Sequence, residues 1–162
     1  SAAKILIDAA SDAGVHVRRR AVEALGRTQP RGCLAALAAA THDADWRVRA
    51  AAAWALGQTD DRRATEPLLA CLTDPHRNVR RRAASAWAFG TLSDPRAAKP
   101  LADALAGGNP TVRLFAAEAL GRLARPEAQA ALHAAAENDG DPQVRDAAAR
   151  ALRQLAPAQQ AH

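Results

Sequence analysis

Apolar positions along the chain follow a helical period, and the same arrangement returns five times. Its clearest marker is a Val-Arg pair followed by small residues and leucine, as in "VRAAAAWALG". The five pairs begin at Val17, Val48, Val79, Val112 and Val144, so the period is 31 to 33 residues. A second apolar segment, such as "DDRRATEPLLACLTD", separates successive pairs. Each period therefore predicts two short helices, A and then B.

Helix B places its apolar residues on one stripe. With the valine numbered zero, positions 0, 4, 7 and 8 fall within one sector of a helix. The stripe predicts a core of Val17, Ala21, Ala24 and Leu25 in the first period and of Val48, Ala52, Ala55 and Leu56 in the second. One helix pair cannot bury such a stripe alone, so the pairs are expected to stack. The glycines that follow the stripe are interpreted as helix ends: Gly26, Gly57, Gly90 and Gly121.

The repeated motif resembles that of HEAT-like repeat proteins, in the short form first described in phycobilin lyases. The residues that carry the resemblance are the Val-Arg pair, the small residues after it, the Leu-Gly close, and an aspartate five positions before the valine: Asp12, Asp43, Asp74 and Asp139. The motif departs from this pattern at Gly107, which replaces an aspartate, at Arg153, which replaces the last glycine, and in the two extra residues of "VRRRAASAWAFG".

The resemblance implies an all-α fold, a right-handed α-solenoid of about five two-helix repeats whose B helices line the concave surface. We expect one domain over 1–162, with repeats at about 1–27, 28–58, 59–91, 92–122 and 123–156 and a tail at 157–162. It also implies that the repeated arginines bind the aspartates of the turns between helices: Arg18, Arg49, Arg80, Arg113 and Arg145. Gly107 should leave one of these contacts weaker.

The opposite face of helix B, at positions −1, 2, 3, 6 and 10, differs from repeat to repeat and is the candidate binding surface. It carries large apolar residues with arginines around them, the residue types that dominate interface hot spots. The predicted partner-binding residues are Trp54, Trp87, Leu114, Phe115, Arg19, Arg20, Arg81 and Arg82, with Trp46 at the border of the two faces. Space filling in an alanine-rich stack is the alternative for the aromatic residues, and fastening of the helix start is the alternative for Trp46.

The third repeat allows two alignments. Aligned forward from Val79, Trp87 takes the core leucine position and Phe89 faces outward; aligned back from Gly90, the two exchange roles. The sequence after Gly90 follows the second alignment. We therefore expect Trp87 to face the groove, with the two extra residues absorbed in the first half of the helix, as a π-bulge or added length, or just before it.

The composition shows an excess of basic over acidic residues and few side chains suited to catalysis or metal binding. The chain of 162 residues has 22 basic and 17 acidic residues, a net charge of +5, and only Lys4 and Lys99 are lysines. Cys33 and Cys71 are interpreted as small buried residues in a reducing compartment, and a cytoplasmic location is expected. The five histidines form no helical pair suited to a metal. We expect no catalytic site, no cofactor and no metal.

These features predict a non-catalytic scaffold that binds a protein or peptide with its B helices. Nucleic-acid binding by a basic, Trp-bearing groove is an alternative. The resemblance alone raises a bilin lyase-like or chaperone-type role. No membrane association is expected. The first helix lacks an evident polar capping face, which terminal repeats normally need. A longer solenoid and a homodimer through the N-terminal repeat are therefore two further hypotheses.

Overall fold

The computed structural model describes residues 1–160, and the side chains of residues 1–156, and all regular structure in this part of the chain is helical. The A helices are α1 (Ala2–Ala9), α3 (Cys33–Ala40), α5 (Thr65–Ala70), α7 (Ala98–Gly107) and α9 (Gln129–Asn138). The B helices are α2 (Val15–Thr28), α4 (Trp46–Gly57), α6 (Arg77–Phe89), α8 (Pro110–Leu123) and α10 (Pro142–Gln160). Single 3-10 turns extend the later A helices: η1 (Arg62–Ala64), η2 (Cys71–Thr73), η3 (Pro95–Ala97) and η4 (Pro126–Ala128).

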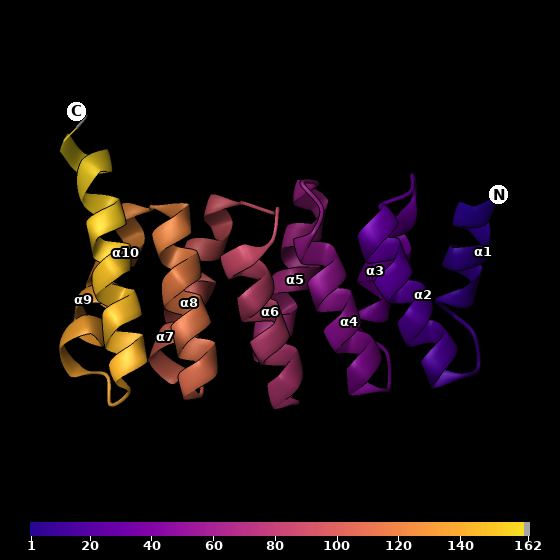
Figure 1. Ribbon diagram of the computed structural model, residues 1–162, viewed down its shortest axis with the longest axis horizontal. Coiled ribbons are helices and arrows are strands. Elements are labelled where there is room, and N and C mark those ends of the chain that lie inside the picture. The colour runs from indigo at the N-terminus through magenta and orange to yellow at the C-terminus, as the bar shows by residue number, and fades with distance from the viewer. Residues whose placement is uncertain (161–162) are drawn as a thin grey trace.

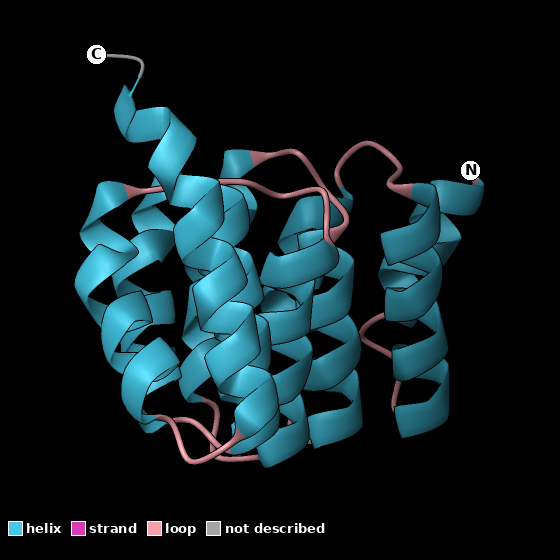
Figure 2. Ribbon diagram, turned by 60° about the vertical axis from the view of Figure 1, so that its left-hand side comes forward, coloured by secondary structure: helices cyan, strands magenta, loops and turns pink. Residues whose placement is uncertain are grey.

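The helix pairs stack along one axis and confirm the predicted α-solenoid. The first and last helices, α1 and α10, lie at opposite ends of this axis (Figure 1). In the same view, α6, α8 and α10 lie in front of α5, α7 and α9, so the B helices form one layer and the A helices another. The helices run alternately up and down, joined by short loops at the two edges (Figure 2). One edge therefore carries the turns from A to B, and the other the turns from B to A.

Small residues let neighbouring B helices approach closely. A Cβ atom added at Gly26 or Gly57 would lie only 2.6 Å from the Cβ atom of Ala55 or Ala86 on the next B helix. The A helices stand further apart, with cavities of about 350 and 230 Å³ in the α5–α7 and α7–α9 gaps. Because the stack is tighter on the B side, the B helices form its inner face.

The predicted role as helix ends is correct for two of the four glycines, since Gly57 is the last residue of α4 and Gly90 caps α6. It is wrong for the other two. Gly26 and Gly121 lie within α2 and α8, and the left-handed residues that end those helices are Gln29 and Ala124. At Gly26 and Gly121 the Leu-Gly pattern thus marks a close helix contact rather than a helix end. The reason is steric, since only a residue without Cβ admits the alanine of the neighbouring helix.

The predicted core stripe is correct in the second repeat and only partly correct in the first. Val48, Ala52, Ala55 and Leu56 are fully buried. In the first repeat Ala21 and Leu25 are buried, but Ala24 is half-buried and Val17 is 46% exposed. Val17 lies at the terminal face of the stack, where only α1 covers α2 on that side. The period is the same in both repeats, and the number of neighbours decides burial.

The third repeat follows the alignment from Val79, so the prediction that Trp87 faces the groove is wrong. Trp87 is 1% exposed and Phe89 is 67% exposed. α6 is an unbroken α-helix one residue longer than α4 at its C-terminal end, and the second extra residue lengthens the following loop. There the backbone N–H groups of Thr91 and Leu92 donate to the carbonyl oxygen of Gly57, at 2.7 and 3.1 Å. Leu92 is itself part of this loop, and its side chain is buried.

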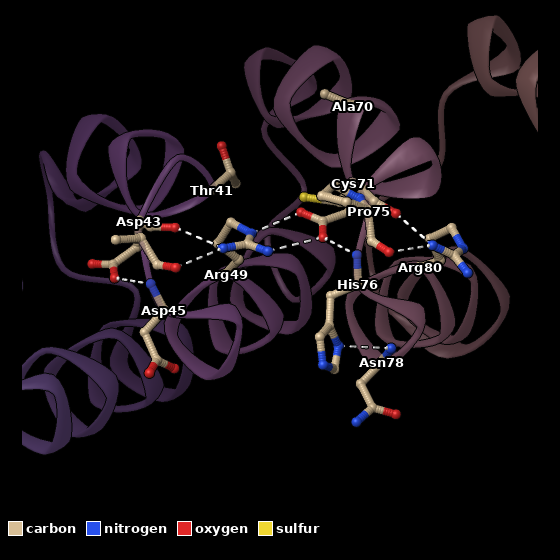
Figure 3. A network of polar contacts seen from close by, with 12 residues as sticks. Thr41, Asp43, Asp45, Arg49, Ala70, Cys71, Pro75, His76, Asn78 and Arg80 are labelled. Atoms are coloured by element: carbon tan, nitrogen blue, oxygen red, sulfur yellow. Dashed lines mark hydrogen bonds and ion pairs between the residues drawn. The ribbon is translucent and has the colours of Figure 1, made fainter.

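A ladder of ion pairs joins successive repeats at the edge of the A-to-B turns. The guanidinium of Arg18 donates to both carboxylate oxygens of Asp43, at 2.7 and 3.0 Å, and Arg49 does the same with Asp74, at 2.8 and 3.1 Å. Arg113 binds Asp139 in the same way. Figure 3 shows Arg49 between the turns of two repeats, where it also donates to the carbonyl oxygen of Asp43. Three of the five predicted arginine–aspartate contacts are thus confirmed, and each runs from one repeat to the next.

Arg145, the fifth predicted arginine, has no ion pair among the described residues and donates to the carbonyl oxygen of Asp139, at 2.7 Å. Arg80 is the exception that the sequence predicts. Its Nη1 donates to the carbonyl oxygens of Asp74 and Pro75, at 2.6 and 2.9 Å, but it has no ion pair among the described residues. The next repeat has Gly107 where the others have aspartate. On the opposite edge, the buried carboxylate of Asp94 links the same two repeats by accepting the hydroxyl of Thr65, at 2.8 Å.

The ladder makes stability depend on acid. The hydrogen bonds from Arg18 and Arg113 lower the pKa of Asp43 and Asp139. Burial alone would raise the pKa of Asp74, but the hydrogen bonds from Arg49 and the His76 amide outweigh it and lower that pKa. A lowered folded-state pKa contributes stability that is complete above the ordinary aspartate value, about 3.9, and is lost as the pH falls through the folded value.

We therefore expect the urea midpoint to be insensitive to these groups between about pH 5 and 7 and to fall below about pH 4. The measurement is urea unfolding followed by circular dichroism across this range. Asp43→Asn serves as the control, since it should be less stable at pH 7 and lose less on acidification. An unchanged wild-type midpoint at pH 3 would contradict the expectation.

Candidate partner-binding face

The inner face of the B helices holds the candidate site, which divides into two parts. The first is a cavity of about 190 Å³ lined by residues of α2, α4 and α6: Glu23, Arg27, Ala51, Trp54 and Arg82. Trp54 forms its apolar wall. The Trp54 ring packs over Gly26, where an added Cβ would lie 2.7 Å from Cζ3. The missing side chain at Gly26 thus makes room for the indole, which remains half-buried.

The second part is an aromatic pair between α6 and α8. Phe89 and Phe115 meet edge to face, with ring centroids 5.6 Å apart. Phe115 is half-buried against the core, whereas Phe89 is one of the most exposed large apolar side chains among the described residues. Edge-to-face geometry is the arrangement that aromatic rings prefer. Phe115 therefore holds Phe89 in place on the surface.

Charged groups surround these aromatic residues, and several are already paired. Arg19 binds Glu23 at 3.2 Å, and Arg20 reaches the same carboxylate at 4.0 Å. Arg150 binds Glu118 at 2.6 Å. Arg122 donates to the carbonyl oxygen of Trp87 at 3.1 Å, which ties the end of α8 to the end of α6.

The predicted residues are not all brought together. Trp54 and Arg82 share one cavity, and Phe115 supports a neighbouring aromatic residue, but Trp87 belongs to the core. Leu114 is half-buried and packs against the core, and Arg81 is exposed on α6. Phe89 takes the place that the sequence assigned to Trp87. The alignment that counts forward from Val79, rather than back from Gly90, would have identified Phe89 as the exposed residue.

Trp46 lies apart from the face, at the edge with the A-to-B turns. Its ring stacks on the imidazole of His76 with centroids 4.2 Å apart and planes 4° from parallel. The Arg47 guanidinium lies 5.3 Å from the same indole. His76 caps α6 by accepting the N–H of Asn78 at its Nδ1 atom, as Figure 3 shows. The contact joins the start of α4 to the start of α6.

Cys33 and Cys71 are buried and unlinked, as predicted. Burial raises the pKa of both thiols, that of Cys71 to about 12, which keeps it protonated and poorly nucleophilic. Across the described part of the chain, no three His, Cys, Asp or Glu residues gather as a metal site would require. None of the described helices is both long and apolar enough to span a bilayer.

Comparisons with known proteins place the fold in a family. The model of HEAT repeats matches residues 3–88 and 98–161, and that of the PBS lyase HEAT-like repeat matches residues 81–107. The chain therefore belongs to the HEAT-repeat family, as the sequence motif indicated. No curated protein is similar enough in sequence to count as a relative.

Solved structures share the whole stack. A chain from the complex of CpcE and CpcF of phycocyanin lyase from Nostoc sp. PCC7120 superposes with a TM-score of 0.83 at 28% identity, over 96% of this chain and 65% of the other. This chain thus spans less than two thirds of that protein's length. Human deoxyhypusine hydroxylase has a TM-score of 0.67 at 26% identity, over 96% and 62%. A designed armadillo repeat protein in complex with the peptide (KR)4 has a TM-score of 0.72 at 21% identity, over 93% and 80%, and shows the fold alone.

Proposed function

We propose that the chain is a non-catalytic scaffold that binds a peptide segment of another protein along the inner face of its B helices. The observation that carries this proposal is Phe89, which is 67% exposed yet held by Phe115 on the inner face of the stack. Contact with solvent alone does not favour an exposed aromatic ring held in one orientation. A partner that covers it gains apolar burial without ordering the ring.

The cavity beside Trp54 indicates what kind of segment binds. Its apolar wall suits one aliphatic or aromatic anchor side chain. Arg27 and Arg82 flank this wall and outnumber Glu23, so an anchor next to an acidic residue matches the site better than a basic one. Nucleic acid matches less well, because Glu23 and Glu118 lie on this face and already occupy Arg19 and Arg150.

A lyase-type accessory role is the second candidate, and it rests on the similarity to the phycocyanin lyase complex. The two candidates share the prediction that this chain works against another protein. They differ in whether a tetrapyrrole is also bound. Titration of the purified chain with a bilin, followed by absorbance, distinguishes them; no spectral change leaves peptide binding as the sole function proposed.

Selection from a random peptide library displayed on phage tests the main proposal. We expect wild-type protein to enrich peptides that carry an apolar anchor beside an acidic residue. Trp54→Ala and Phe89→Ala should each weaken binding of those peptides by about 30-fold or more, the loss typical of a hot-spot residue. The measurement is the dissociation constant by fluorescence polarisation.

Ile5→Ala is the matched control. Ile5 is 69% exposed, almost the same as Phe89, but it lies on α1 at the end of the stack. Its removal should leave peptide affinity unchanged. Circular dichroism confirms that each variant remains helical. Equal affinity of the selected peptides for wild type, Trp54→Ala and Phe89→Ala would exclude the inner face as the site.

A further inference from the structure

The ion-pair ladder has a vacant position between the third and fourth repeats. Arg49 shows how a filled position is built: Nη1 donates to backbone carbonyls of its own turn, while Nε and Nη2 bind the carboxylate of the next repeat. Arg80 keeps the first half of this arrangement, with Nη1 bound to the carbonyl oxygens of Asp74 and Pro75. Its guanidinium is thereby fixed, but no described carboxylate lies within 4.0 Å of it. In Figure 3 the dashed lines from Arg80 run to the carbonyl oxygens of its own turn.

A cavity lies where the missing carboxylate would be. It has a volume of about 350 Å³ and is lined by Arg80 together with residues of η2, α7 and α8, among them Leu72, Gly107 and Val112. A Cβ atom added at Gly107 would meet nothing within 4 Å, so the space of the absent side chain is open. Asp103 also lines the cavity, but its carboxylate pairs with Lys99 at 3.6 Å and is largely exposed.

We propose that this cavity is a binding site for a carboxylate carried on a short apolar group, held by Nε and Nη2 of Arg80. The protein itself supplies the template, because the same arginine atoms bind a carboxylate at three other positions of the ladder: Arg18, Arg49 and Arg113. Bidentate pairing is the strong and geometrically specific mode of binding between guanidinium and carboxylate. The volume lies at the lower end of the range of small-molecule sites, and the leucine and valine side chains favour an apolar body.

The site is distinct from the inner face of the B helices. Its walls come from A helices, the A-to-B turns and the first turns of α6 and α8, whereas Trp54 and Phe89 lie near the other ends of their B helices. Loss of one site therefore leaves the other intact, and the two proposals are tested separately.

The experiment follows the Arg80 Nε–Hε resonance of uniformly ¹⁵N-labelled protein during titration with sodium butyrate at constant ionic strength. Sodium chloride replaces butyrate in the reference series. We expect a saturable shift of this resonance with butyrate alone. Arg80→Gln identifies the resonance by its disappearance. The affinity of this variant is obtained from the shifts of neighbouring backbone amides during the same titration. It should bind butyrate about 10- to 100-fold more weakly than wild type, the effect of losing a charge-assisted hydrogen bond.

Gly107→Asp is the decisive variant, because it restores the side chain that the other repeats have at this position. Its carboxylate should occupy the site from within, abolish the response to butyrate, and raise the thermal midpoint. Gly107→Ala adds the Cβ atom without the charge and should retain the response. A capped Ala-Glu-Ala peptide, whose one carboxylate is a side chain, shows whether the site prefers a small acid or an acidic residue of a partner protein.

Either preference supports a carboxylate site. Two outcomes overturn it: no saturable shift at Arg80 with butyrate or the peptide, or equal shifts in wild type and Gly107→Asp. Both are readable without any loss of fold, since Gly107→Asp and Gly107→Ala alter a position with open space around it.

Discussion

Replacing Trp87 with alanine is expected to lower the free energy of unfolding by about 3–5 kcal/mol, the range for removing a fully buried aromatic side chain. Trp87 is the largest buried side chain among the described residues, and the cavity left behind would lie at the centre of the stack. Urea unfolding followed by far-UV circular dichroism measures the loss, with the denaturant slope checked for two-state behaviour.

Phe89→Ala is the control for Trp87→Ala, because both remove an aromatic ring from the last turns of α6. Phe89 is mostly exposed, so its removal should change the free energy of unfolding by no more than about 1 kcal/mol, chiefly through the lost edge contact with Phe115. A larger loss for Phe89→Ala than for Trp87→Ala would show that the other alignment of the third repeat is the true one.

Gly90→Ala is the second substitution with a large expected effect. An added Cβ atom would overlap the carbonyl oxygens of Gly57 and Ala86, both of which are backbone atoms of helices and cannot turn away. The clash should displace the loop that carries Leu92 and break its two hydrogen bonds to Gly57. Overpacking and two lost hydrogen bonds together amount to about 3 kcal/mol.

The thermal midpoint of Gly90→Ala should accordingly fall by about 6–12 °C, as expected for a domain of this size. Gly140→Ala is the matched control, since nothing lies within 4 Å of its added Cβ atom. It should leave the midpoint nearly unchanged. Equal midpoints for the two variants would mean that the contact between the third-repeat loop and α4 is not tight in solution.

The sequence was sufficient for the fold because each repeat carries the same pattern, and five copies reinforce one another. The Val-Arg period placed the helix pairs, and the aspartates of the turns identified the ladder and its vacant position at Gly107. The repeated pattern could not predict which apolar residues of the first repeat are buried. Val17 follows the same motif as Val48, but among the described residues only α1 packs against that side of α2, and the number of neighbours is a property of the array.

The candidate site was less predictable because it depends on one insertion. Trp87 and Phe89 are two residues apart, and which of them enters the core depends on where the chain accommodates two extra residues. That choice is made by the loop after α6, through backbone contacts to Gly57 that no side-chain pattern reveals. Trp54 was easier, because the equal spacing of the first two repeats leaves its position on α4 unambiguous.

The arginine–aspartate pairs of the ladder all point the same way along the chain, from one repeat to the one that follows. The array therefore has a polarity, like a polymer with a head and a tail, and every filled joint is chemically identical. If one whole repeat between two filled joints were deleted, the repeats on either side would meet through the same arginine and aspartate. Duplication or deletion of whole repeats can thus change the length of the solenoid without changing the contacts between repeats. The joint at Arg80 differs from the filled joints and therefore identifies its position in the array.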